Sequence, residues 1–170
     1  GETVWSNAAS LMGRFVGNHD VTRFVSEAAG SNLSDPWLLP PPQMDDPQAL
    51  DRLWIATALT FTLPGIPILY YGDESGLVGA NDPDNRRPYW PLGSDAPLNL
   101  SEPRAAHFER VAQLGRLRVC LNAFNEIVPQ VIFLANDDER ISFMRGKSGQ
   151  EIIVIVQRGE AIATDLAIPL

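Results

Sequence analysis

Two short apolar runs, each closed by a cluster of polar residues, set the architecture that this chain can adopt. The first runs from Leu11 to Gly17 and ends in Asn18-His19-Asp20, and the second runs from Ile66 to Tyr71 and ends in Gly72-Asp73-Glu74. The second run does not alternate polar with apolar residues, so both of its faces are expected to be covered, which is typical of a parallel strand. Both runs are therefore predicted to be strands of a parallel sheet.

A helix is predicted after each strand. The proline-rich segment Ser31 to Asp46 is predicted to be a surface excursion, after which Asp46 suits the N-cap and Pro47 the first position of a helix that Pro64-Gly65 ends. Apolar residues at helical spacing predict a second helix from about Glu102 to Leu121. The order strand, helix, strand, helix predicts a parallel sheet with right-handed crossovers.

After about Ala123 the sequence changes to short β-type runs separated by turn residues, which predict an antiparallel meander. These runs are Val128 to Ala135, Arg140 to Arg145, Glu151 to Gln157 and Ala161 to Ile168. Four strands are too few to close a sandwich, and two βα units cannot close a barrel, which takes eight units and typically about 250 residues. The chain is therefore predicted to be a segment of a larger fold.

Asn18-His19-Asp20 is the first candidate for a functional site. In βα architectures, polar residues at the C-terminal end of a strand face the active-site rim. Asn and Asp are also common turn formers, so an Asx-turn explains the same tripeptide. Its local sequence alone leaves both interpretations open.

The segment Asn81-Asp82-Pro83-Asp84-Asn85-Arg86-Arg87 is the second candidate. A calcium loop of the EF-hand type fails, because the required glycine and glutamate are not correctly placed when the pattern starts at Asp82. A solvated turn with an ion pair remains open. So does sugar recognition, since a carboxylate and a guanidinium can chelate adjacent hydroxyls with directed hydrogen bonds.

Taken together, these segments resemble glycoside hydrolase family 13, the α-amylase family. Phe15-Val16-Gly17-Asn18-His19-Asp20 is similar to the family's strand-seven signature, Gly65 to Glu74 to its strand-eight signature, and Gly79 to Arg87 to the loop that follows. The resemblance implies an α/β fold class, in which residues 1–123 form the last βα units of a TIM (β/α)8 barrel, strands seven and eight with their helices. Residues 124–170 would begin an antiparallel β-sandwich domain.

The resemblance also implies roles for four residues. Asp20 takes the place of the family's third active-site carboxylate, which hydrogen-bonds the sugar in the cleavage subsite and stabilises an oxocarbenium-like transition state. His19 would donate to hydroxyls of the same sugar, and Asp82 and Arg86 match positions that bind glucose units further toward the non-reducing end. Asn18 is expected to shape the strand end.

Retaining glycoside hydrolysis needs two further carboxyl groups roughly 5 Å apart, a nucleophile and an acid/base. In the family they lie on strands four and five, upstream of strand seven, and no segment before Leu11 supplies them. By the resemblance, Asp73 and Glu74 belong to the end of strand eight and support the site. The chain alone is therefore expected to be inactive.

Composition limits the partners. The formal charge of −8 disfavours nucleic acid, and no apolar stretch approaches the ~20 residues that span a bilayer. The single cysteine, Cys120, excludes an internal disulfide and is predicted to be a buried thiol. His107 is expected to be exposed or capping. Trp54 and Tyr70 are expected to pack between helix and sheet, and Trp90 is the candidate for stacking on a sugar.

The leading interpretation is a fragment of a secreted or periplasmic bacterial hydrolase acting on α-1,4-glucans. Its partners would be an α-glucan and the missing N-terminal part of its own barrel, and its uncovered edges predict self-association. No cofactor is expected in this segment, although the intact protein could hold calcium. Two alternatives remain open: a transglycosylase fragment of the same family, and a non-catalytic carbohydrate-binding or scaffold module.

Overall fold

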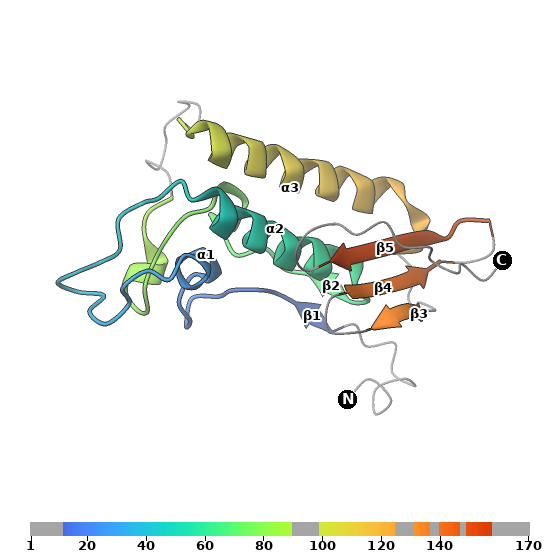
Figure 1. Ribbon diagram of the computed structural model, residues 1–170, viewed down its shortest axis with the longest axis horizontal. Helices are drawn as coiled ribbons and strands as arrows, with labels where there is room; N and C mark the ends of the chain where they lie inside the picture. The colour runs from blue at the N-terminus through green and yellow to red at the C-terminus, as the bar shows by residue number, and fades with distance from the viewer. Residues whose placement is uncertain (1–11, 90–98, 125–130, 137–139, 147–148, 158–170) are drawn as a thin grey trace. The chain divides into compact units, whose positions relative to one another are not determined.

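The computed structural model describes residues 12–89, 99–124, 131–136, 140–146 and 149–157, and these form two compact units. The first unit spans Gly13–Gly115 and the second includes the described residues from Arg116 onward. The elements of the first, in chain order, are β1 (Gly13–Arg14), α1 (Phe24–Ala28), α2 (Pro47–Thr62), β2 (Ile66–Pro67), the 3₁₀ turns η2 (Asp73–Ser75) and η3 (Asp84–Arg86), and most of α3 (Glu102–Cys120) (Figure 1). No helix among the described residues has the length and apolar character that crossing a bilayer requires.

β1 and β2 pair in parallel, with Gly13 opposite Ile66 and Arg14 opposite Pro67. A further backbone hydrogen bond runs from the Ile68 N–H to the Arg14 carbonyl at 2.7 Å. The predicted parallel pairing of the two apolar runs is confirmed, although each run contributes only two residues to the sheet. The turns after β1 and β2 consequently leave the same edge of the sheet.

The expectation that both faces of the second run are covered is wrong for this chain. Ile66 is 50% exposed and Ile68 is 48% exposed. Among the described residues β2 has β1 as its neighbouring strand and no second strand on its other edge. An apolar run without alternation therefore identified a strand suited to burial, while the described chain does not supply the groups that would bury it.

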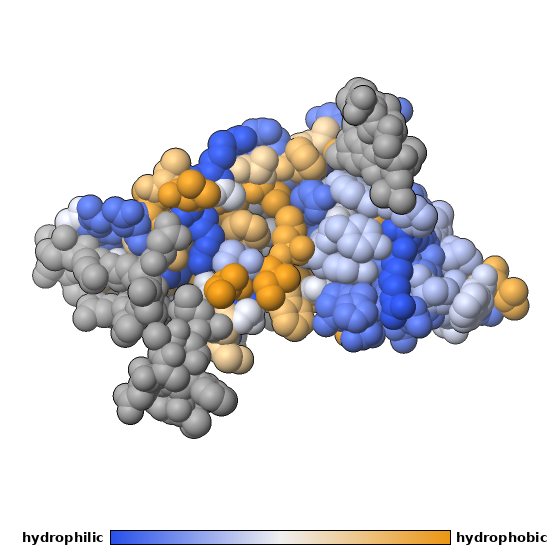
Figure 2. All heavy atoms as spheres, turned by 180° about the vertical axis from the view of Figure 1, so that it is seen from behind, coloured by the Kyte–Doolittle hydropathy of each residue, from blue (hydrophilic) through white to orange (hydrophobic). Residues whose placement is uncertain are grey.

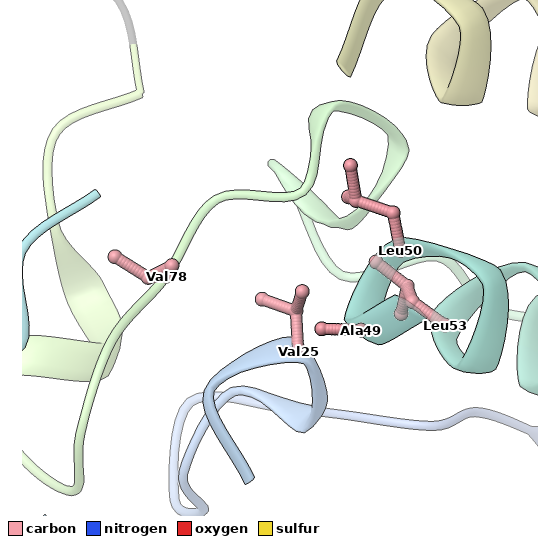
Figure 3. Packing of buried hydrophobic residues seen from close by; sticks show 5 residues of the cluster. All are labelled: Val25, Ala49, Leu50, Leu53 and Val78. Atoms are coloured by element: carbon pink, nitrogen blue, oxygen red, sulfur yellow. The ribbon is translucent and has the colours of Figure 1, made fainter. Parts of the chain in front are cut away.

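The core of the first unit lies where α1 meets the first turns of α2 (Figure 3). Asp46 caps α2 by accepting a hydrogen bond from the Gln48 N–H at 2.9 Å, and Pro47 is its first residue, as the sequence predicts. The buried side chains are Val25, Ala49, Leu50, Leu53 and Val78. Each fully buried Val or Leu contributes about 1.5–3 kcal/mol of apolar transfer free energy.

α3 matches the predicted second helix, but two predictions on it are wrong. His107 is buried, because its imidazole packs inward and Nε2 lies 3.0 Å from the Asp73 carbonyl oxygen. Cys120 is exposed, as are Leu117 and Val119 beside it. Helical spacing identified the apolar face of α3, but it does not reveal which turns of that face have a neighbour.

The second unit contains η4 (Asn122–Phe124), β3 (Val131–Asn136), β4 (Arg140–Arg145) and β5 (Ile152–Gln157). The strands form an antiparallel sheet in the order β3-β4-β5, which confirms the meander for these three. Phe143 is buried, and the buried guanidinium of Arg145 lies 5.5 Å from the centroid of the Phe124 ring. The fourth predicted run, 161–168, lies outside the described residues.

Candidate functional site

The chain leaves β1 through an exposed turn that carries His19 and Asp20. Asn18 shapes this turn, because its Oδ1 accepts a hydrogen bond from the Asp20 N–H at 2.7 Å. The Asx-turn considered for the tripeptide is therefore present. It directs both following side chains into solvent, with His19 Nε2 3.3 Å from Asp20 Oδ1.

The loop from Gly79 to Arg87 is held in shape by Asp84. Its carboxylate accepts two hydrogen bonds from Arg87 at 2.6 Å and one from the Ala80 N–H at 2.7 Å. Burial by itself would raise the pKa of Asp84, but the hydrogen bonds from Arg87 and Ala80 and the guanidinium charge outweigh it and lower that pKa. Arg87 also donates to the Pro41 carbonyl at 2.6 Å, which ties the proline-rich excursion to this loop.

Arg86 joins the loop to the turn after β1. Its Nε donates to the His19 carbonyl at 3.1 Å, while Nη2 lies 3.3 Å from Asp82 Oδ1 and 3.8 Å from Asp20 Oδ1. The structure thus brings together all four residues that the resemblance singled out. Their side chains stay open to solvent, with exposed fractions of 65% for His19, 69% for Asp20, 56% for Asp82 and 47% for Arg86.

This cluster combines two carboxylates, a guanidinium and an imidazole on one exposed surface. Carboxylates accept hydrogen bonds and a guanidinium donates them in a planar fork. The set can therefore bind neighbouring hydroxyl groups both as acceptors and as donors of hydrogen bonds. Exposed ion pairs of this kind contribute only about 0–1 kcal/mol to stability. The arrangement is therefore suited to recognition of a polyhydroxylated ligand more than to holding the fold together.

A buried arginine that the sequence analysis did not single out lies beneath this surface. Arg23 is 2% exposed, and it donates from Nε to the Asn85 carbonyl at 3.0 Å and from Nη1 to the Tyr71 carbonyl at 2.6 Å. Its guanidinium carbon lies 4.3 Å from the Tyr70 ring centroid and 4.8 Å from that of Tyr71. The sequence offered one signal for this role, a charged residue between the apolar residues Val21 and Val25. A charge in such a stretch suggests a buried side chain, and buried charges are nearly always paired.

Asn85 is the second buried residue that the sequence analysis missed. Its side-chain Nδ2 donates to the carbonyl of His19 and to that of Val21, both at 2.9 Å. Within a loop rich in Asn and Asp, nothing distinguishes the buried amide at 85 from the exposed Asn81 by residue type. Only the fold reveals that one amide points inward.

Asp73 completes the buried network by pairing with Arg23, at 3.1 Å between Oδ1 and Nη1. Burial nevertheless raises the pKa of Asp73 to about 6, because the lost hydration outweighs the attraction of the guanidinium. Burial likewise lowers the pKa of His107, whose ring faces the Asp73 backbone. Glu74 turns back to accept a hydrogen bond from the Gly72 N–H at 2.9 Å.

The described part of the chain contains no group of three His, Cys, Asp or Glu side chains that could hold a metal ion. A hollow of about 490 Å³ opens between Ala29 and the excursion residues Pro41 and Met44, and none of the four exposed residues lines it. Trp90, the predicted stacking residue, lies outside the described residues. The candidate site is therefore the exposed surface around Arg86.

Comparison with known proteins identifies relatives, although no model of a protein family matches the chain. The chain is 32% identical to α-amylase 1 of Lipomyces kononenkoae over 64% of its length, and 31% identical to the β/α-amylase of Paenibacillus polymyxa over 87%. It spans only 13% and 10%, respectively, of those two proteins.

Among solved structures, the chain is similar to the α-amylase of Geobacillus thermoleovorans, which was solved in complex with acarbose. The two are 25% identical with a TM-score of 0.61, and the match covers 91% of this chain and 30% of that enzyme. Enzymes of this kind have a TIM-barrel fold. The chain thus corresponds to part of such an enzyme.

Proposed function

The chain is homologous to part of the α-amylases and related enzymes of glycoside hydrolase family 13, and we propose that it contributes one side of the active site in a retaining hydrolase of α-1,4-glucans. In this proposal β1 and β2 are strands seven and eight of the (β/α)8 barrel. The unit that holds β3 to β5 begins the β-domain that follows the barrel.

One observation carries the proposal: Arg86 lies between Asp20 and Asp82, 3.8 Å from the first and 3.3 Å from the second. These residues come from the turn after β1 and the loop after β2, and parallel strands bring their C-terminal ends to the same edge. In TIM-barrel enzymes the active site is built at that edge. The acarbose bound by the Geobacillus relative favours an α-glucan as the ligand.

In the proposed reaction, Asp20 accepts hydrogen bonds from hydroxyls of the sugar whose bond is cleaved, and its negative charge stabilises the positive charge that develops on that sugar. His19 donates to the same sugar. Asp82 and Arg86 bind the next glucose units toward the non-reducing end. The nucleophile and the acid/base, roughly 5 Å apart in retaining enzymes, come from a part of the barrel outside this chain.

The uncovered sides of β2 fit the same proposal. Ile66 and Ile68 are half exposed, although their run has the composition of a fully buried strand. In a closed barrel, neighbouring strands and helices would cover them. The chain alone then lacks both catalytic carboxylates and part of its core, and we expect no glycosidase activity from it.

Experiments on the full-length protein distinguish two alternatives. A transglycosylase would share the geometry described, but a sugar would accept the glycosyl group in place of water. Analysis of the products formed from maltotriose decides between the two. A carbohydrate-binding module would bind maltotriose without cleaving it. The homology to amylases favours the enzyme.

The experiment that tests the proposal is the release of reducing sugar from starch by the full-length protein and its Asp20→Asn variant. Loss of one transition-state electrostatic contact lowers turnover by at least about 10²-fold. Asp51→Asn is the matched control, because Asp51 is an exposed carboxylate on α2 that pairs with Arg110. Turnover of Asp20→Asn close to that of Asp51→Asn would contradict the assignment.

A further inference from the structure

We propose that Arg23 is the positioning residue of the candidate site, in that its buried guanidinium fixes the turn carrying His19 and Asp20 against the loop carrying Asp82 and Arg86. The inference rests on the proposed function for its consequence on catalysis. Its structural part stands on the contacts of Arg23 alone. None of the roles considered for the four exposed residues involves this side chain.

Arg23 contacts every segment that forms the site. Its backbone N–H donates to the Gly79 carbonyl at 3.1 Å, where the loop begins, and its Nε donates to the Asn85 carbonyl in the middle of that loop. Its Nη1 donates to the Tyr71 carbonyl at the end of the second apolar run. One residue, three positions after Asp20, thus holds three backbone segments at fixed separations.

The loop from Gly79 to Arg87 in turn holds the turn that carries His19 and Asp20. Asn85, whose carbonyl accepts from Arg23, donates from its side chain to the His19 and Val21 carbonyls. Arg86, the next residue, donates to the same His19 carbonyl. A displacement of Asn85 would therefore move the backbone of His19 and change the distance from Asp20 to Arg86.

The chemistry of this position requires arginine. The guanidinium is planar, carries five donors in a rigid fork and stacks on aromatic faces, whereas an ammonium is a compact point charge on a flexible stem. Nε and Nη1 of Arg23 each donate a hydrogen bond to a backbone carbonyl, while the guanidinium lies against the rings of Tyr70 and Tyr71. Lysine at this position would keep the charge beside Asp73 but could not make the Nε bond to Asn85 together with the Nη1 bonds.

The buried ion pair with Asp73 offers a way to separate positioning from stability. Replacing both members of a buried pair with apolar residues is often neutral or stabilising, whereas removing one member leaves an uncompensated charge. The double variant Arg23→Met/Asp73→Leu removes both charges. It also removes the bonds to Asn85 and Tyr71 on which the positioning role depends.

The experiment measures kcat and KM of the full-length protein on maltoheptaose for the wild type, Arg23→Lys, the double variant and Arg110→Lys. Arg110 is an exposed arginine of the same unit that pairs with Asp51 and serves as the matched control. Displacements of about 1 Å lower catalysis by about 10²-fold, so we expect kcat/KM to fall by that factor in both Arg23 variants and to stay within twofold in Arg110→Lys. A wild-type kcat/KM in either folded Arg23 variant would overturn the proposal.

Hydrogen exchange of the backbone amides, followed by mass spectrometry without sugar, tests the same inference independently of activity. We expect faster exchange in 18–23 and 79–87 in both variants, with unchanged exchange in α2. If the wild type has no activity on glucans, the proposed function fails and exchange alone decides the positioning role. Unchanged exchange in the two segments would overturn it. If Arg23→Lys does not fold, the double variant supplies the comparison.

Discussion

The side-chain amide of Asn85 donates a hydrogen bond to the backbone carbonyl of His19 at 2.9 Å, although 66 positions separate the two residues. The same nitrogen also donates to the carbonyl of Val21. The loop from Gly79 to Arg87 thereby fixes the main chain of the turn after β1. The positions of the exposed charges in the site depend on this buried amide.

Asn85→Ala is expected to lower the free energy of unfolding by about 1–3 kcal/mol, because it removes the hydrogen bonds to the carbonyls of His19 and Val21, and only the His19 carbonyl keeps a second donor, Arg86. Asn32→Ala is the control, since Asn32 is exposed and accepts its hydrogen bonds from Ser34 nearby. Urea denaturation of the two variants measures the difference. Equal losses would show that the amide of Asn85 has no special part in joining the segments.

Gly79→Ala is expected to destabilise the chain, because the added Cβ would lie 2.7 Å from the Asp84 carbonyl oxygen and 2.9 Å from the Asn85 Cα. Overpacking of this kind costs about 1–3 kcal/mol. Gly115→Ala is the matched control within α3, where nothing lies within 4 Å and alanine stabilises a helix by about 0.5–1 kcal/mol. Thermal unfolding should therefore move the two Tm values in opposite directions, and a common direction would contradict the close packing at Gly79.

Substitutions at Asp82 and Asp84 are expected to have different effects, although the two residues are only two positions apart: the first should affect ligand binding and the second the stability of the fold. Asp82→Ala removes an exposed partner of Arg86 and should raise KM for maltoheptaose in the full-length protein while changing stability by only about 0–1 kcal/mol. Asp84→Ala removes three hydrogen bonds inside the loop and should cost about 1–3 kcal/mol. Denaturation and steady-state kinetics on both variants check this; a larger stability loss in Asp82→Ala would reverse the assignment.

The described fold was largely predictable where local chemistry decides it. Asp46 and Pro47 start α2 by capping and fixed backbone geometry, and the two apolar runs pair as parallel strands. The sequence did not reveal which apolar surfaces are covered by neighbouring elements. His107 is buried and Cys120 exposed, opposite to expectation, because the periodicity of α3 does not say which of its turns meets a neighbour.

The candidate site was predictable in its exposed part and not in its buried part. His19, Asp20, Asp82 and Arg86 were found because they match a family pattern, and they do lie together. Arg23 and Asn85 contact mostly backbone carbonyls, which carry no residue identity. A pattern of side chains cannot reveal a partner of that kind.

The stability of the chain should depend on pH through Asp73. Its pKa is about 6 in the folded chain against 3.8 as the ordinary value, so between these pH values the folded chain holds a proton that the unfolded chain has released. Its contribution to the free energy of unfolding is therefore greatest below pH 3.8, falls as the pH rises toward 6, by about 3 kcal/mol, and is constant above it.

Asp73→Asn isolates this effect, because the amide does not titrate. We expect the free energy of unfolding of the wild type, minus that of Asp73→Asn, to decrease from pH 4 to pH 6 in urea titrations. Other carboxyl groups contribute equally to both proteins and cancel. A difference that stays constant or increases with pH would contradict the raised pKa.

The isolated chain is expected to associate with itself in solution. Phe15, Ile66 and Ile68 are exposed around the two-stranded sheet, and Figure 2 shows apolar residues open on one face of the molecule. Static light scattering at rising concentration should give an increasing mass, which Phe15→Ser/Ile68→Ser reduces. Leu38→Ser is the control, because Leu38 is an equally apolar, exposed residue of the proline-rich excursion and belongs to neither strand. A monomer at all concentrations would contradict the expectation.

The bond from Arg87 to the carbonyl of Pro41 has a consequence for how this surface can change during evolution. Any amino acid at position 41 presents the same oxygen, so the identity of that residue is not constrained by the bond. The excursion can drift in sequence while remaining attached to the loop that carries Asp82 and Arg86. New side chains can thus arise at the margin of the proposed sugar-binding surface while the loop keeps its shape, which is a route to different ligand preferences if the proposed function holds.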